Sequence, residues 1–557
     1  MTNMKRFIIS TSLCLVPALV LAQGPLDPKD LLKPLGENWP SYSGDYSDKR
    51  YSSLTQINQT TVKNLTLAWV GTLTAGAGGG AGGGGRGGGA GGGPTIIGGE
   101  GPDPAPGAAA TASIKGATLE VNGILYTSAP DNAWAIDART GRTLWHYFWK
   151  TKGGTHIGNR GLAMYGNWLY METPDDYLVS LDARTGKERW HKIISDFSEQ
   201  YFSTAAPLVI GNHILVGTGD DVDSPGYLQS VDPETGELQW KKYLVPMKEG
   251  DPGLNTWQSL DAAQHGGAQP WIPGAYDPDT HLYMIGTGNP TPAYTAGRDG
   301  DNLFTCTLIA LDVDTGNMKW YFQTSPHETH DWDSTQTPIL IDAMFKGRMR
   351  KMVLQATRNG FFFVLDRVTG EHLVTSKFSA ANWDLGIDDK GHPIRNPMKD
   401  PIIPGALVSP TNGGSTNWPP PAYSPEAGLF YVRQNDGYAM YYLTEADPRG
   451  AMGLGGKEED GVGSTGSYIT AIDYKTGKIA WRHESTGGGG GGLLTTAGKV
   501  LFGGGSGGIE AFDVMTGKPL WNSRIGGLSN APETYMIDGH QYLLCIAGDT
   551  MYSFTIY

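Results

Sequence analysis

The sequence contains very little cysteine: three residues in a chain of 557. Cys14 lies in the apolar run at the start of the chain, which leaves Cys306 and Cys545 for the remainder. This scarcity excludes a fold built on disulfides, because such scaffolds use many cysteines, although one long-range bridge stays open. No C-x-x-C-H motif occurs, so the sequence offers no site for covalently attached haem.

Long apolar runs are missing beyond residue 22. The first 22 residues, MTNMKRFIISTSLCLVPALVLA, combine a basic start, a short apolar stretch and a small-residue exit. This pattern is typical of a secretory signal peptide, and the stretch is too short to remain as a transmembrane helix. We therefore expect residues 1–22 to be removed, the remainder to be exported to the periplasm, and no transmembrane segment.

An excess of positive charge is also missing. The formal net charge is −14, and it is near −16 once Lys5 and Arg6 of the leader are removed. An acidic chain of this kind is a poor partner for nucleic acid and a plausible docking surface for a basic protein.

What the sequence has in abundance is one repeated motif, D-x-x-T-G-x-x-x-W. It recurs with its aspartate at Asp137, Asp182, Asp232, Asp312, Asp366, Asp473 and Asp513, and only the copy at Asp366 lacks the tryptophan. The aspartate and glycine of each copy are typical of a tight turn between two strands. Short apolar or alternating strands such as GILYTSA and HILVGTG precede most copies.

Strand-turn-strand units of this length predict the four-stranded antiparallel blades of an all-β propeller. Seven motif copies and the N-terminal segment ending in LAW predict eight blades. Residues 23–557 are expected to form this single domain. A glycine-rich insert at about 75–111 is expected to be disordered, because it has almost no apolar side chains to bury.

One loop, SPHETHDWDST (325–335), gathers three carboxylates and two imidazoles. A solvated turn could have the same composition, so the loop does not decide its own role. His327 and His330 are three residues apart, but no cysteine or further histidine stands at zinc spacing. We expect these histidines to orient the loop or bond to backbone rather than to ligate a metal.

The repeats resemble those of the pyrroloquinoline quinone (PQQ) dehydrogenases, in particular the alcohol and methanol dehydrogenase branch. The resemblance extends from GENWPSYSGDYSDKRYSSLTQI to APETYMIDGHQYLLCIAG. In the stretch GGAQPWIPGAYDPDTHLYMIGTGNPTP it implies that Trp271 stacks on the quinone and that Asn289 ligates a metal ion. An aromatic floor suits a flat cofactor and an amide oxygen suits a hard cation, although Trp271 could also be an ordinary blade tryptophan.

The same resemblance assigns roles to the acidic loop and to ATRNG. It implies that Asp331 is the catalytic base and a metal ligand, and that Asp333 is the additional carboxylate of lanthanide-using members. Arg358 would contact the reactive carbonyl of the quinone and stabilise the reduced oxygen. A set of further residues is implied in the same way: Arg160 for a cofactor carboxylate, Asn417 and Trp418 for the pocket wall, Thr204 and Thr218 for hydroxyl contacts, and Asp221 for the metal.

Three departures from the family pattern stand out. Gly154 and Thr155 occupy the positions of a vicinal cysteine pair. Asp221 stands where a glutamate ligates the metal, so the ion must shift or Asp223 must help. The stretch KGATLEV (115–121) lacks a glutamate expected to meet the cofactor.

The function implied is a periplasmic quinoprotein dehydrogenase that oxidises a small alcohol with PQQ and Ca²⁺ or a lanthanide ion. Without haem in the chain, electrons would pass to an external acceptor, most simply a soluble c-type cytochrome. The alternative is a cofactor-free propeller that binds a ligand or partner, which the missing cysteine pair and the missing glutamate favour. The joint presence of Trp271, Asn289, Asp331, Asp333 and Arg358 favours the enzyme. Substrate identity and oligomeric state are not predicted.

Overall fold

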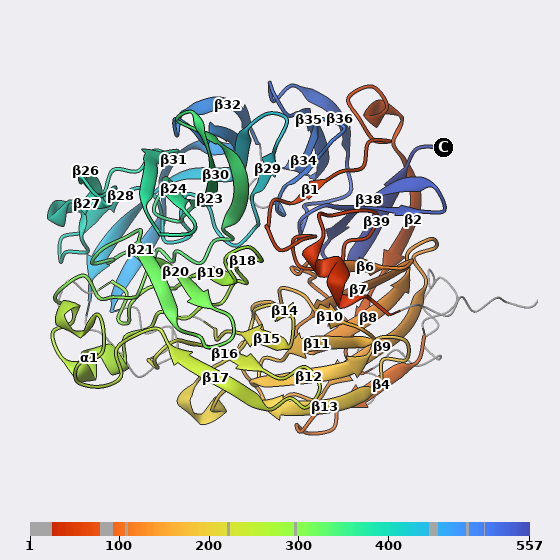
Figure 1. The fold of residues 1–557 in the computed structure, drawn as a ribbon, viewed down its shortest axis with the longest axis horizontal. Helices are drawn as coiled ribbons and strands as arrows, with labels where there is room; N and C mark the ends of the chain where they lie inside the picture. Colours follow the sequence, from red (N-terminus) through yellow and green to blue (C-terminus); the bar gives the residue numbers. More distant parts are fainter. Residues whose placement is uncertain are drawn as a thin grey trace, which may run out of the picture.

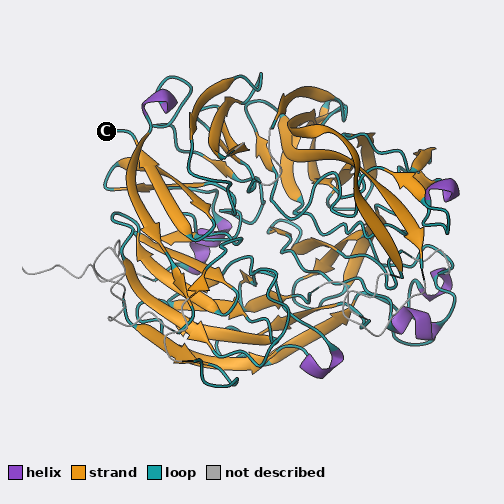
Figure 2. Ribbon diagram, turned by 180° about the vertical axis from the view of Figure 1, so that it is seen from behind, coloured by secondary structure: helices purple, strands orange, loops and turns teal. Residues whose placement is uncertain are grey.

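The computed structural model describes residues 25–77, 93–105, 110–219, 223–294, 298–444, 455–485, 490–505 and 507–557. Its strands form a ring of eight blades, each a mainly antiparallel sheet, around a central axis (Figures 1 and 2). The expected all-β, eight-bladed propeller is therefore confirmed. The expected signal peptide, residues 1–22, lies outside the described residues. No helix in the described part is long and apolar enough to cross a membrane.

Blades 1 to 4 follow one another along the chain, each with its first strand nearest the centre of the ring (Figure 1). Their strands are β6 (Leu119–Val121), β7 (Ile124–Ala129), β8 (Asn132–Asp137) and β9 (Thr143–Trp149); β10 (Ala163–Tyr165), β11 (Trp168–Glu172), β12 (Tyr177–Asp182) and β13 (Glu188–Ile193); β14 (Leu208–Ile210), β15 (His213–Val216), β16 (Tyr227–Val231) and β17 (Leu238–Tyr243); β18 (Ala275–Asp277), β19 (Leu282–Gly286), β20 (Thr307–Asp312) and β21 (Met318–Gln323).

Blades 5 to 8 complete the ring, and the last one takes its outer strand from the N-terminal part of the chain. Their strands are β22 (Ile339–Phe345), β23 (Arg348–Ala356), β24 (Phe361–Asp366) and β25 (His372–Lys377); β29 (Ala422–Ser424), β30 (Leu429–Leu443), β31 (Gly456–Asp473) and β32 (Ile479–Glu484); β33 (Leu494–Thr496), β34 (Val500–Gly505), β35 (Gly508–Asp513) and β36 (Pro519–Ser523); β37 (Glu533–Ile537), β38 (His540–Ala547), β39 (Thr550–Thr555) and β2 (Thr66–Thr72).

Short elements decorate this ring. The strands are β1 (Tyr51–Ser52), β3 (Thr74–Ala75), β4 (Thr95–Gly98), β5 (Ala110–Thr111), β26 (Asp384–Ile387), β27 (Pro393–Arg395) and β28 (Ala406–Val408). The helices are α1 (Leu260–Gln264) and the 3₁₀ turns η1 (Pro28–Leu32), η2 (Val62–Asn64), η3 (Phe197–Glu199), η4 (Leu254–Thr256) and η5 (Pro397–Lys399).

The glycine-rich insert is partly structured, which differs from the disorder expected over 75–111. Residues 78–92 and 106–109 lie outside the described part, but β4 pairs in parallel with β9 as a fifth strand of blade 1. The physical reason is that Ile96 packs against the apolar core beside that blade. Composition averaged over the whole insert conceals this short apolar stretch.

The repeated motif joins neighbouring blades. In six copies the indole Nε1 of one blade donates to a backbone carbonyl in the D-x-x-T-G turn of the next; the pairs are Trp69–Ala138, Trp145–Ala183, Trp190–Glu234, Trp240–Val313, Trp320–Arg367 and Trp481–Val514. The turn glycine lies against the same indole. In those six turns an added Cβ would lie 2.4–3.1 Å from the preceding tryptophan ring.

An N-terminal segment, Trp39–Ser52, runs across the inside of the ring, and we call it the channel segment. Its carbonyls accept hydrogen bonds from the innermost strands of blades 4 to 7, and Trp39 pairs with Glu120 of blade 1. Arg50 is 1% exposed and donates to the carbonyls of Tyr42, Leu493 and Pro532. The segment therefore ties together blades that are far apart in the sequence.

Candidate active site at one face of the ring

Strand direction places the predicted site residues on one face. The D-x-x-T-G turns join third to fourth strands, so loops that join second to third strands, or one blade to the next, lie at the opposite face. All described residues predicted for the site lie in loops of this second kind; they are Arg160, Thr204, Thr218, Trp271, Asn289, Asp331, Asp333, Arg358, Asn417 and Trp418. Asp221 lies outside the described residues.

Asp333 is the centre of the polar group. Its Oδ1 accepts a hydrogen bond of 2.9 Å from the backbone N–H of Asn289, and its Oδ2 lies 2.7 Å from Arg358 Nη2. Arg358 Nη1 donates to the backbone carbonyl of Asp331 at 2.8 Å and lies 3.7 Å from Asp331 Oδ1. Asp333 is completely buried and Asp331 is 5% exposed. Three loops from blades 4 and 5 thus bring an amide, two carboxylates and a guanidinium together.

The remaining side chains of the acidic loop hold its backbone. Glu328 accepts from the backbone N–H groups of His330 and Asp331, and Asp331 adopts a positive φ of 66°. His330 stacks on Trp332 and its Nε2 contacts the carbonyl of Lys399 at 2.8 Å. His327 Nδ1 contacts the carbonyl of Gly300. Both histidines contact backbone carbonyls, as the sequence predicted. Because Glu328 accepts hydrogen bonds from the loop backbone, Asp331 and Asp333 are the carboxylates of this loop that lie beside Arg358.

Aromatic and cationic groups face each other next to these carboxylates. The guanidinium carbon of Arg160 lies 4.4 Å from the ring centroid of Trp271, and that of Arg358 lies 5.4 Å from it. Arg160 also approaches the Trp418 ring at 5.9 Å and donates to the carbonyl of Thr204 at 3.1 Å. Two arginines over an indole suit a flat anionic molecule, because the ring supplies dispersion and the guanidinium groups supply charge.

As far as the structure describes the chain, Asn417 and Thr218 form no hydrogen bond with the carboxylates, arginines or Trp271 of the candidate site. The Asn417 amide bonds within its own loop, to the carbonyl of Gly413 and to the N–H of Trp418. Thr218 is buried, and its hydroxyl has no hydrogen-bond partner among the described residues. It follows β15, next to the part of the chain around Asp221 that is not described.

Buried polar atoms test whether a metal ion and a cofactor fit. Within the described part of the chain, Asn289 Oδ1, Trp271 Nε1 and Thr218 Oγ1 are buried without a hydrogen-bond partner. Buried polar atoms are usually satisfied, so such orphans indicate a missing ligand. No group of three or more His, Cys, Asp or Glu residues within the described ranges could hold a metal. The available donors are therefore two carboxylates and one amide oxygen, which suit a hard cation.

The loop that carries Gly154 and Thr155 in place of the cysteine pair is held by polar contacts. His156 Nε2 lies 2.7 Å from Asp131 Oδ2 and its Nδ1 lies 2.9 Å from the carbonyl of Gly154. The hydrogen bond to Asp131 raises the pKa of His156. A Cβ on Gly154 would lie 2.1 Å from the carbonyl oxygen of Pro174, so the backbone here excludes a cysteine side chain. Cys306 and Cys545 are both buried and neither is in a disulfide, so the long-range bridge left open by the sequence does not form.

Sequence reasoning missed Glu533. Its Oε1 accepts a 2.9 Å hydrogen bond from the N–H of Thr118, within KGATLEV, the stretch that lacks the glutamate expected to meet the cofactor. Burial raises the pKa of Glu533 to about 8. The two residues are 415 positions apart in the chain. No local motif could have indicated this contact, and the only signal was a glutamate inside an apolar inner strand.

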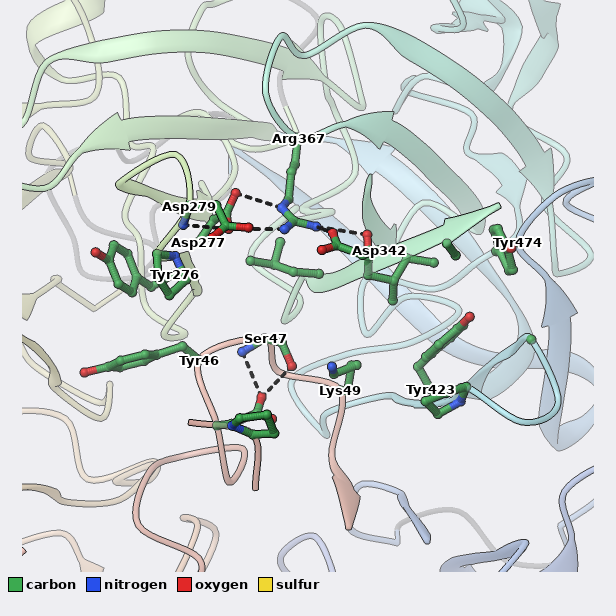
Figure 3. A pocket seen from close by; sticks show the side chains of 18 of the residues that line it. Tyr46, Ser47, Lys49, Tyr276, Asp277, Asp279, Asp342, Arg367, Tyr423 and Tyr474 are labelled. Carbon is green, nitrogen blue, oxygen red and sulfur yellow. Dashed lines mark hydrogen bonds and ion pairs between the residues drawn. The ribbon is translucent and has the colours of Figure 1, made fainter. Parts of the chain in front are cut away.

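A separate cavity of about 790 Å³ opens at the opposite face, between the channel segment and blades 4 to 6. In Figure 3 Arg367 points between Asp277 and Asp342, and Tyr46, Tyr423 and Tyr474 lie around the cavity. Arg367 Nε lies 2.8 Å from Asp277 Oδ2. None of the predicted site residues lines this cavity.

Comparison with known proteins gives relatives over most of the chain. Residues 39–380 match the family model described as glucose/ethanol/alcohol dehydrogenase, beta-propeller domain, and residues 465–554 match one described as outer membrane protein assembly factor BamB. The quinoprotein alcohol dehydrogenase PedH of Pseudomonas putida is 33% identical over 77% of this chain and 77% of its own length. The quinohemoprotein alcohol dehydrogenase of Comamonas testosteroni is 32% identical over 92% of this chain and 72% of its own.

Solved structures agree with these relatives. The crystal structure of the Comamonas testosteroni quinohemoprotein alcohol dehydrogenase superposes with a TM-score of 0.83 and 29% identity, over 95% of this chain and 82% of that one. A europium-containing methanol dehydrogenase gives a TM-score of 0.80 and 26% identity, over 95% and 99% of the two chains. The resemblance noted in the sequence is thereby confirmed: the chain belongs to the PQQ-dependent glucose/ethanol/alcohol dehydrogenase β-propeller family.

Proposed function

We propose that the chain is a periplasmic quinoprotein dehydrogenase that oxidises the hydroxyl group of a small alcohol or related compound, using PQQ and a Ca²⁺ or lanthanide ion. The observation that carries the proposal is the meeting of Asn289, Asp331, Asp333 and Arg358 beside the face of Trp271. The relatives named as alcohol dehydrogenases support the same reaction class. A structural propeller has no need of this combination.

The cofactor would lie on Trp271, within reach of both arginines. Arg160 and Arg358 approach the indole at 4.4 and 5.4 Å, so they would offer positive charge to a planar anion stacked on it. Thr204, Thr218, Asn417 and Trp418 would complete the walls of this slot. The unpartnered Nε1 of Trp271 and hydroxyl of Thr218 are available to such a ligand.

The metal ion would be held by the oxygen atoms of Asn289, Asp331 and Asp333, together with Asp221. When bound, the quinone supplies an acceptor for two electrons and the ion acts as a Lewis acid on its carbonyl oxygen. Asp331 would take the proton of the substrate hydroxyl as general base. Arg358 Nη1, bound to the Asp331 backbone carbonyl at 2.8 Å, fixes the orientation of that loop.

Electrons would leave to an external acceptor, because the sequence has no C-x-x-C-H motif for haem of its own. A soluble c-type cytochrome is the simplest candidate. The formal net charge of −14 favours a basic partner.

The test is to titrate the purified chain with PQQ in Ca²⁺ or La³⁺, following quinone absorbance and the reduction of an artificial dye with short-chain alcohols. Asp331→Asn should lower turnover by about 10²- to 10⁴-fold, the range for loss of a general base, while PQQ binding changes little. Asp299→Asn, at an exposed position of a neighbouring loop, is the matched control. If neither ion supports PQQ binding, the chain is instead a propeller that binds another ligand or a partner.

A further inference from the structure

Lys115, the first residue of KGATLEV, lies directly beside Arg160. The N–H of Ala117 donates to the carbonyl of Arg160 at 2.9 Å, and Ala117 and Gly161 form an isolated parallel bridge. A Cβ added to Gly116 would lie 2.6 Å from the carbonyl carbon of Arg160. The two backbones are therefore in contact, so Lys115 and Arg160 both start from the wall of the candidate cofactor slot.

The side chain of Lys115 is half-buried in the loop that lacks the cysteine pair. Its ammonium donates to the carbonyl of Ile157, and a Cβ on Gly158 would lie 3.3 Å from its Cδ. No ion pair between Lys115 and a carboxylate occurs among the described residues. Burial and, secondarily, the charge of Arg160 lower the pKa of Lys115.

Two neighbouring cations next to an aromatic slot are unfavourable unless an anion joins them. Like charges repel, and partial burial removes the water that would otherwise screen them. The resemblance implies a glutamate in this stretch that meets the cofactor, whereas Lys115 is a cation. A ligand carboxylate placed between the ammonium and the guanidinium would satisfy both groups.

We propose that Lys115 is a cofactor-binding residue which, together with Arg160, binds a carboxylate of the quinone. This inference rests on the proposed function, because it needs PQQ in the slot above Trp271. Lys115 thus adds one cation to a site for an anionic cofactor. Its bond to Ile157 also draws the 154–158 loop toward that carboxylate.

The affinity for PQQ tests the assignment without any need for turnover. In the full chain with saturating Ca²⁺, the dissociation constant is measured from quenching of tryptophan fluorescence. Lys115→Met keeps the length of the side chain and removes the charge, and it should weaken binding by between about 10-fold and 100-fold, as expected for a lost charge-assisted hydrogen bond. Lys115→Arg should stay within about threefold of the parent chain.

Two controls separate this role from a purely structural one. Lys187→Met, in an exposed turn of the opposite face, should leave the dissociation constant unchanged. The trimethyl ester of PQQ, which lacks negative charge, should bind the parent chain and Lys115→Met equally. Without ligand, Lys115→Met should not lower the Tm, because it removes repulsion with Arg160, but its Tm should rise less on adding PQQ.

The outcomes are distinguishable. Equal PQQ affinity of the parent chain and Lys115→Met, within about twofold, overturns the role of Lys115 and leaves the proposed function intact. A lowered Tm without ligand together with an equal loss for the ester assigns Lys115 a structural role and also overturns the inference. Failure of the parent chain to bind PQQ with Ca²⁺ or La³⁺ overturns both proposals.

Discussion

Buried carboxyl groups are the side chains whose charge this fold changes most. Glu120, Glu172, Asp176 and Glu533 are at most 1% exposed, and burial raises the pKa of each to about 8. In the folded chain these groups keep their protons at a pH where the unfolded chain has released them. The contribution of these four groups to stability is therefore greatest at acidic pH, and it falls as the pH rises from about 5 to 8.

Glu172→Gln tests this at one residue. Both carboxyl oxygens of Glu172 are buried without a hydrogen-bond partner in the described part, and glutamine stays neutral at every pH. The variant should gain about 1–3 kcal/mol in unfolding free energy relative to the parent chain at pH 8, and little at pH 5. Denaturant titration at the two pH values measures the difference. Glu199→Gln, an exposed control, should show none, and an equal effect of Glu172→Gln at both pH values would contradict the expectation.

Asp333 should decide metal preference at the candidate site. It adds a second buried carboxylate beside Asp331, and a trivalent ion requires more anionic oxygen than Ca²⁺ does. Asp333→Ala should therefore weaken La³⁺ affinity at least tenfold more than Ca²⁺ affinity. Competition between the two ions, read from PQQ-dependent fluorescence, measures the ratio. An unchanged ratio would mean that Asp333 serves only Arg358, to which it lies at 2.7 Å.

Neighbouring blades are joined by a repeated contact, in which the tryptophan indole of one blade packs against the turn glycine of the next. Gly186 has a φ of +69°, and its Cβ position lies 2.6 Å from the Trp145 ring, whereas Gly211 has a φ of +58° with nothing within 4 Å. Both Gly→Ala substitutions carry the cost of a left-handed backbone, about 1 kcal/mol. Only Gly186→Ala also displaces an indole, so its loss of unfolding free energy should exceed that of Gly211→Ala by about 1–3 kcal/mol. Equal losses measured by denaturant titration would show that the contact adds nothing.

At the scale of the whole molecule, the N-terminal part of the chain holds the ring together through two separate connections. Strand β2 supplies the outer strand of blade 8, and the channel segment crosses the inside of the ring. Arg50 joins this segment to residues 443 and 482 positions away. The closure makes the N-terminal segment part of the stability of blades 6, 7 and 8.

Arg50→Met should therefore destabilise the entire propeller. The substitution leaves three buried carbonyl groups without their donor, and a loss of about 3–5 kcal/mol is expected from breaking such a buried network. The neighbouring Lys49→Met, which keeps the backbone bond to Tyr423, should cost less than about 1 kcal/mol. Thermal unfolding should stay a single transition in both variants. A small effect of Arg50→Met would mean that water replaces the arginine in the channel.

The sequence by itself determined the repeating unit of this protein. The D-x-x-T-G-x-x-x-W motif predicts strand, turn and strand because its constraints are local: a side-chain cap, a positive φ and a buried indole. The candidate site residues could be identified for the same reason, because each stands in a short stretch that resembles a motif of the family. They are Trp271, Asn289, Asp331, Asp333 and Arg358. The sequence also predicted that His327 and His330 would orient the loop or bond to backbone, and both contact backbone carbonyls.

Only the tertiary structure decided which of these residues meet. Glu533 reaches Thr118 because ring closure brings the first and last blades together. Lys115 reaches Ile157, 42 positions away, because the two residues stand before and after blade 1. Such contacts depend on strand register and on blade number, which no local pattern encodes. For the same reason the clash between a side chain at Gly154 and the Pro174 carbonyl, which excludes a cysteine there, became visible only in three dimensions.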